Sequence, residues 1–83
     1  MRIAMLEMMR TICSGIIADE SLAENIAELS LKFRLHGNVD DAGMLYTLSE
    51  FHRYNAAKMR EELDGVTDQY LLLCDDISGL PDA

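Results

Sequence analysis

Aromatic residues are scarce in this sequence, and tryptophan is absent. The 83 residues include three tyrosines, two phenylalanines and no tryptophan, although about half of all residues are hydrophobic. The core must therefore consist mainly of leucine, isoleucine, methionine and alanine, which suits helices better than strands. No stretch shows the alternation of apolar and polar residues that is typical of a strand. These features predict an all-α protein, in one domain over residues 1–83.

Cysteines and glycines are few and widely separated, which argues against several kinds of site. Cys13 and Cys74 fit no metal-knuckle or redox spacing, and we interpret them as reduced, buried residues of a cytoplasmic protein. The five glycines occur singly, so there is no phosphate-binding loop. The sequence also lacks a nucleophile elbow and a His-Glu-x-x-His motif. We therefore predict a protein that is not an enzyme and needs no cofactor or metal.

Positive charge is also scarce. Seven basic residues face fifteen acidic ones, which gives a formal net charge of −8 and a pI near 4.4. This charge opposes binding to nucleic-acid phosphates and anionic lipids, and it is compatible with a basic protein partner. The apolar stretch from Met1 to Ala18 is interrupted by Glu7 and Arg10, so it predicts neither a signal peptide nor a membrane span. The expected partners are therefore proteins.

Helical periodicity with start and stop signals covers most of the chain. Ser21 and Glu24 form a capping box, and Gly37 provides a left-handed stop after His36. Gly65 interrupts the periodicity and Val66-Thr67 restarts it. The centre of the fold is expected to be an antiparallel hairpin of the second and third helices. The four predicted helices cover residues 2–17, 21–36, 41–64 and 67–77.

The first predicted helix carries more apolar surface than one neighbouring helix can cover. Its apolar residues spread over more than half of the circumference, whereas an ordinary surface helix has a narrower stripe. Methionines are frequent in it, and their flexible side chains suit surfaces that adapt to a partner. A weaker apolar stripe follows the far side of the second helix. The predicted partner interface consists of Met5, Met8, Met9, Ile12, Ile16, Leu31 and Leu35.

Two polar residues, His52 and Asn55, interrupt the apolar stripe of the third helix. With a turn centred near residues 38–39, His52 lies opposite Asn25 or Ile26, so we predict a buried polar cluster of His52, Asn55 and Asn25. Such a cluster would fix the register of the helices, as single polar residues do in coiled coils. The alternative is a metal site. Helical metal-binding bundles use a Glu-x-x-His pair, and His52 and Asn55 occupy those places here without matching the pattern.

Together these features predict a small helical bundle of three to four helices, built on the hairpin at about 21–36 and 41–64 and forming a homodimer. The predicted function is that of a non-enzymatic, acidic protein-interaction module of the adaptor, chaperone or inhibitor type, acting through its methionine-rich apolar face. One alternative is an acidic decoy that mimics nucleic acid and blocks a nucleic-acid-binding protein. The other is a metal-binding bundle that uses His52. Binding by a decoy would weaken sharply with added salt, whereas apolar binding would not.

Overall fold

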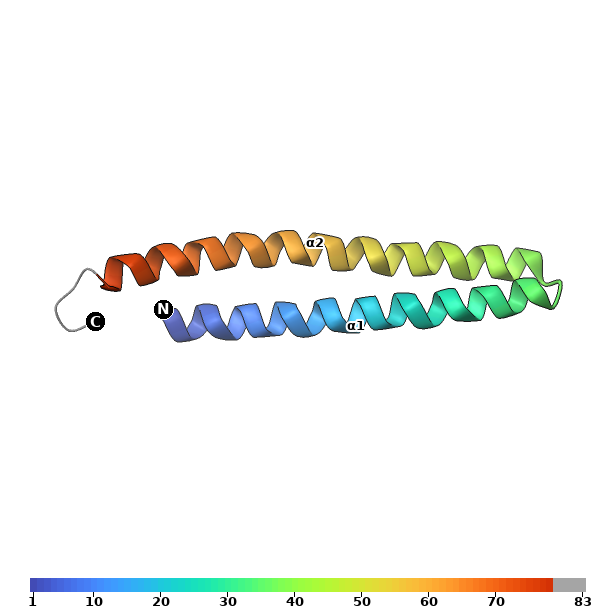
Figure 1. The fold of residues 1–83 in the computed structure, drawn as a ribbon, viewed down its shortest axis with the longest axis horizontal. Coiled ribbons are helices and arrows are strands. Elements are labelled where there is room, and N and C mark those ends of the chain that lie inside the picture. Colours follow the sequence, from blue (N-terminus) through green and yellow to red (C-terminus); the bar gives the residue numbers. More distant parts are fainter. Residues whose placement is uncertain (79–83) are drawn as a thin grey trace.

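The chain forms an antiparallel hairpin of two long helices (Figure 1). The computed structural model describes the backbone of residues 1–78 and the side chains of residues 1–74. Helix α1 spans Arg2–Leu35 and helix α2 spans Val39–Ser78. No strand occurs within the described backbone. The all-α class and the antiparallel hairpin are therefore confirmed, whereas the prediction of three to four helices is wrong.

The two predicted interruptions are absent because nothing at those positions prevents a helix from continuing. Around Ser21 there is neither proline nor glycine, and both Ser21 and Glu24 are exposed inside α1 instead of capping a new helix. Gly65 lies inside α2 with open space around it. A single glycine costs a helix only about 1 kcal/mol, which contacts on either side can offset. Gly79, Leu80 and Pro81, which in the sequence are the stop signal of the last predicted helix, lie outside the described residues.

The turn between the helices follows the prediction for Gly37. This residue has a φ of +86°, and its N–H donates to the carbonyl of Arg34 at 3.1 Å. The N–H of Asn38 donates to the carbonyl of Phe33 at 2.9 Å. These two bonds form a Schellman motif, in which a left-handed residue satisfies the last carbonyls of a helix. Helix α2 then begins at Val39, two residues earlier than predicted.

Buried residues at seven-residue intervals, all of them small except Ile16, line the contact between the helices. The two buried series, which we call the seam, are Ile16, Ala23 and Ser30 on α1 and Ala42, Ser49 and Ala56 on α2. A spacing of seven keeps residues of a helix on one side along a paired neighbour. Small side chains allow two helix backbones to approach closely. The seam therefore lies on positions that an inspection of large apolar residues does not identify.

Two buried serines show how close the helices are. The hydroxyl of Ser30 donates to the carbonyl of Ala42 at 2.7 Å, and that of Ser49 donates to the carbonyl of Ala23 at 2.9 Å. Each short side chain thus reaches the backbone of the other helix, once in each direction. The reciprocal bonds fix the register of the hairpin. His52 consequently lies beside Asp19, and the predicted register opposite Asn25 or Ile26 is wrong.

The hairpin is elongated and has a thin core. Its principal extents are 68 × 14 × 13 Å and its radius of gyration is 19.1 Å, whereas a compact domain of this length has about 12 Å. The accessible surface is 6244 Å², against about 5000 Å² for a compact monomer of 9.3 kDa. The chain therefore exposes about 1200 Å² more surface than a compact protein of its size. Charged residues recur too often along the described helices for either to span a bilayer.

Candidate interaction surface

The two broad sides of the hairpin differ in chemistry. On one side, which we call the apolar face, Met8, Leu22 and Leu29 of α1 follow one another at multiples of seven residues and are all exposed. On α2, Leu48 and Phe51 accompany them. Helical spacing places these residues next to the half-buried apolar positions that flank the seam. The apolar face therefore includes residues of both helices.

The apolar face is hollowed near the turn, where side chains of both helices meet. Leu29, with 42% of its surface exposed, contributes from α1, and Phe51, with 55%, from α2. The two adjoining shallow hollows are lined by Leu29, Phe33, Asp41, Met44 and Leu45, and by Met44, Thr47, Leu48 and Phe51. All of these residues except Asp41 and Thr47 are apolar, and the hollows are open to solvent. The structure shows no second element of this chain that covers them within the described residues.

One hydrogen-bonded polar pair, Asp19 and His52, interrupts the apolar face. His52 Nδ1 lies 2.9 Å from Asp19 Oδ1, across the two helices. The side chains are 18% and 22% exposed, so the pair is partly shielded from solvent. Because a carboxylate only accepts hydrogen bonds, Nδ1 is the donor in this bond. The rings of Phe51 and His52 make an edge-to-face contact, with their centroids 5.5 Å apart. This contact helps to keep the imidazole on the apolar face.

The opposite side, which we call the charged face, carries ion pairs at its surface. Arg60 donates to Glu20 across the helices at 2.7 Å, and Arg53 donates to Glu50 along α2 at 3.3 Å. All four side chains are well exposed, so each pair contributes at most about 1 kcal/mol. A shallow hollow on this side is lined by Ala27, Ser30, Leu31, Arg34 and Tyr46. This face therefore combines exposed ion pairs with a smaller apolar hollow, to which the exposed Leu31 and Tyr46 contribute.

The structure distributes the predicted interface residues over several environments. Ile16 is buried in the seam, while Met5, Met9 and Ile12 are half-buried where α1 contacts α2. Met8 is exposed on the apolar face. Leu31 and Leu35 are 58% and 76% exposed, but helical spacing places them away from Met8. The seven residues therefore do not form one surface.

The predicted polar cluster is only partly present. Asn25 is exposed and His52 pairs with Asp19, so the predicted role of Asn25 is wrong. Asn55 is half-buried one helical turn beyond His52. Asp19 was not recognised because the sequence pattern around it was interpreted as a break between helices. The seven-residue spacing from Ile12 to Asp19 and Ile26 is the signal that could have placed it beside the seam.

The apolar residues near the turn were recognised, but their exposure was not. Leu22, Leu29 and Leu48 recur with the spacing of a core face, and that spacing alone predicts burial between two helices. The seam is instead filled by smaller residues, which leaves these leucines beside it and partly exposed. The signal for this arrangement is the repeat of alanine and serine at intervals of seven.

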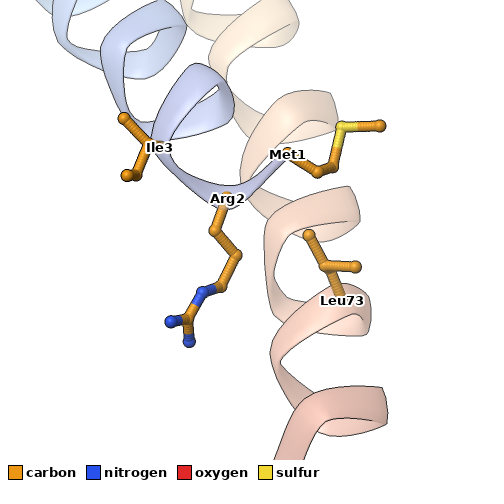
Figure 2. Close-up of a pocket in the computed structure, with 4 residues that line it drawn as sticks. All are labelled: Met1, Arg2, Ile3 and Leu73. Carbon is orange, nitrogen blue, oxygen red and sulfur yellow. The ribbon is translucent and has the colours of Figure 1, made fainter.

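The open end of the hairpin provides another small apolar hollow (Figure 2). Met1, Arg2 and Ile3 of the N-terminal end and Leu73 of α2 line it; Met1 extends toward α2 near Leu73, whereas the Ile3 and Arg2 side chains point away from Leu73. Met1 and Ile3 are 87% and 73% exposed. The hollow brings no nucleophile or general base together with a second polar group, and its lining is suited to apolar contact.

The structure also shows the environment of the two cysteines and of the residues considered as metal ligands. Both cysteines are free; Cys13 is exposed, which contradicts the prediction that it is buried, and Cys74 is half-buried. A hydrogen bond with Cys74 raises the pKa of the Tyr70 phenol.

The described residues of one chain contain no group of three or more histidine, cysteine, aspartate and glutamate side chains placed to hold a metal ion. The Asp19–His52 pair supplies two.

Comparisons of the chain with protein-family models, with curated proteins and with solved structures find no match.

Proposed function

We propose that this protein is a non-enzymatic helical protein-interaction module that works as a homodimer, joined through its apolar face. The observation that carries the proposal is the exposure of that face: residues with the spacing of a core, such as Leu29, Leu48 and Phe51, remain 42–55% exposed in the single hairpin. Two hairpins stacked on this side would form a four-helix core. Whether the module acts as an adaptor, a chaperone or an inhibitor depends on which other protein the dimer binds.

The surface area supports this proposal. The chain exposes about 1200 Å² more than a compact monomer, as derived above. A standard interface buries about 800 Å² on each partner, and homodimer interfaces are often larger. Face-to-face dimerisation would therefore remove a surface comparable to the whole excess. Burial of apolar surface contributes about 25 cal/mol per Å², so the driving force is substantial even after the entropic cost of association.

Phe51 and Tyr46 provide a matched test of which side associates. Both are aromatic residues of α2, and their exposed fractions are 55% and 53%, but Phe51 lies on the apolar face and Tyr46 on the charged face. We expect Phe51→Asp to weaken the dimer about 100-fold or more, because it buries an unpaired charge in each subunit. Tyr46→Asp should leave the dissociation constant nearly unchanged.

Sedimentation equilibrium over a range of protein concentrations measures these constants, and circular dichroism reports whether each variant remains helical. A wild-type chain that sediments as a helical monomer at micromolar concentration would refute the homodimer. A stable dimer of Phe51→Asp together with a dissociated Tyr46→Asp would assign the interface to the charged face. Repeating the measurement at high salt separates apolar association, which persists, from association through charges, which weakens.

A further inference from the structure

The Asp19–His52 pair has unused hydrogen-bonding capacity. Only Oδ1 and Nδ1 take part in the bond between them, whereas a carboxylate has a second oxygen and an imidazole has a second nitrogen. Among the described side chains, no buried nitrogen or oxygen lacks a partner, so the remaining atoms of this pair are still reached by water. Covering the apolar face would remove that water. An interface over this pair must therefore replace the lost hydrogen bonds.

A second copy of the chain can cover the apolar face in two symmetric ways. If the turns of both hairpins lie at the same end, each α1 lies over α2 of the partner. If the turns lie at opposite ends, each α1 lies over α1 of the partner and each α2 over α2. Both arrangements give a four-helix bundle with antiparallel neighbours, and apolar contacts alone discriminate poorly between them.

The ion pair discriminates between the two arrangements. With the turns at the same end, the pairs lie at the same level, so Asp19 meets the partner's His52 and His52 meets the partner's Asp19. Carboxylate and imidazolium then alternate around a ring of four side chains, because His52 needs a proton on both ring nitrogens to donate to a carboxylate on each side. With the turns at opposite ends, bringing the pairs together places carboxylate against carboxylate and imidazole against imidazole. Like charges in a partly buried site are unfavourable, and this arrangement supplies no donor for the second carboxylate oxygen.

Charges near the turn favour the same arrangement. Asp41 borders the apolar hollow beside Leu29 and Phe33. Lys32 follows Leu29 by one helical turn on α1 and is exposed. With the turns at the same end, Asp41 approaches the partner's Lys32. With the turns at opposite ends and the pairs at the centre, Asp41 approaches the partner's Glu62, which has the same charge.

We infer that the second copy binds the apolar face with its turn at the same end, and that Asp19 and His52 complete each other's hydrogen bonds across the dimer in a ring of four side chains. The pair is thus a specificity-determining element that selects one of two dimer orientations. This inference depends on the proposed homodimer and adds its orientation and the residues that determine it.

Distances between spin labels at the turn test the orientation. Asn38 is exposed in the turn, so the variant Asn38→Cys in a Cys13→Ser, Cys74→Ser background carries one label per chain. Stacked helices lie about 10 Å apart, so the same-end dimer predicts a short distance that only the label arms lengthen. For the opposite-end dimer centred on the ion pair, twice the distance from Asp19 to Gly37 gives about 54 Å at 1.5 Å per residue.

A short distance in double electron–electron resonance supports the inference, and a single distance near 54 Å overturns it while leaving the proposed homodimer intact. Absence of any interchain distance, with a monomeric mass, would instead refute the homodimer itself. The two failures are therefore distinguishable. Circular dichroism of the labelled protein checks that helicity is retained.

Removing the pair in two steps tests its specific role. Asp19→Leu or His52→Leu alone leaves one polar group without its partner, and we expect the dimer to weaken roughly tenfold. The double variant replaces the whole ring by apolar side chains, which is often neutral or stabilising. We expect it to dimerise as well as the wild type but to show both label distances, because orientation is no longer selected. Glu20→Leu, which removes an exposed ion pair with Arg60 on the charged face, is the control and should change neither property.

A double variant that keeps one short distance would show that the ion pair does not select the orientation, and it would overturn that part of the inference. The same conclusion follows if Glu20→Leu mixes the orientations as much as the double variant does.

Discussion

The two halves of the hairpin are packed in different ways. In the turn half, residues 20–52, the seam consists of Ala23, Ser30, Ala42 and Ser49, and two serine hydroxyls bond to the opposite backbone at 2.7 and 2.9 Å. In the open half, residues 1–18 and 53–74, Ile16 faces Ala56, and larger side chains such as those of Met9 and Leu63 follow at the same seven-residue spacing. The Asp19–His52 pair lies near the boundary between the halves.

This difference shows how one short chain combines a fixed helix register in the turn half with adaptable side chains in the open half. Short side chains in the turn half let the two backbones approach closely, and the two serine hydroxyls bond to the opposite backbone, which fixes the relative position of the helices there. Methionines in the open half have three rotatable bonds and can fill irregular gaps. The close seam also displaces the large apolar residues to its side, where they form the apolar face. The close packing of short side chains in the seam therefore explains both the fixed register and the exposed apolar surface.

Enlarging a seam residue in the turn half should produce the largest effect. Ala42 is fully buried, and its carbonyl accepts the Ser30 hydroxyl. We expect Ala42→Leu to lower the free energy of unfolding by about 3 kcal/mol or to prevent folding, because the helices must separate. Urea unfolding followed by circular dichroism, at one fixed protein concentration, measures this change.

Ala57→Leu is the matched control, since it makes the same change on the same helix at an exposed position. It should alter the free energy of unfolding by less than about 0.5 kcal/mol. Equal stability of the two variants would show that the seam is not closely packed in the turn half.

A smaller loss is expected at the turn. Gly37 has a φ of +86°, a conformation that costs other residues about 1–2 kcal/mol. Gly37→Ala should lower the free energy of unfolding by about this amount, whereas Gly43→Ala, inside α2 with open space at its Cβ position, should raise it by about 0.8 kcal/mol. Thermal and urea unfolding of both variants provide the comparison. Stabilisation by Gly37→Ala would contradict the left-handed stop.

The sequence predicted the turn because its signal is local. Gly37 after a helical stretch specifies a left-handed stop, and the structure has it there. The continuity of the helices could not be predicted in the same way. The capping pattern at Ser21 and Glu24 is also local, but a cap forms only if the preceding residues leave the helix. The contact of Asp19 with His52 of α2 keeps the residues before Ser21 in helix α1.

The sequence indicated which kinds of residue form the candidate surface, but not on which side of the hairpin they lie. The exposed methionines and leucines were recognised as excess apolar residues, and Met8 does lie on the apolar face. Leu31 and Leu35 were grouped with it because the register of the helices was unknown. That register depends on Ser30 and Ser49, whose hydroxyls reach the opposite backbone only when the helices are already paired. Hydropathy assigns such residues to the surface, so the seam and the pairing of Asp19 with His52 required the structure.

The smallest expected effect tests whether the open half is adaptable. A Cβ added at Gly15 would lie 2.9 Å from Met59 Sδ, whereas one added at Gly65 meets nothing within 4 Å. Gly65→Ala should therefore stabilise the protein by about 0.8–1 kcal/mol, the full gain in helix propensity. If Met59 can rotate away, Gly15→Ala keeps part of this gain, and its change lies between zero and that of Gly65→Ala.

Urea unfolding of the two glycine variants at matched concentration decides the point. A loss of more than about 1 kcal/mol for Gly15→Ala would mean that Met59 is held in place, which is the behaviour of an overpacked, rigid core. The open half would then be as closely fitted as the turn half, and the contrast between them would reduce to side-chain size. A third variant, Gly15→Ala with Met59→Ala, identifies the cause, because removing the thioether should restore the propensity gain relative to Met59→Ala alone.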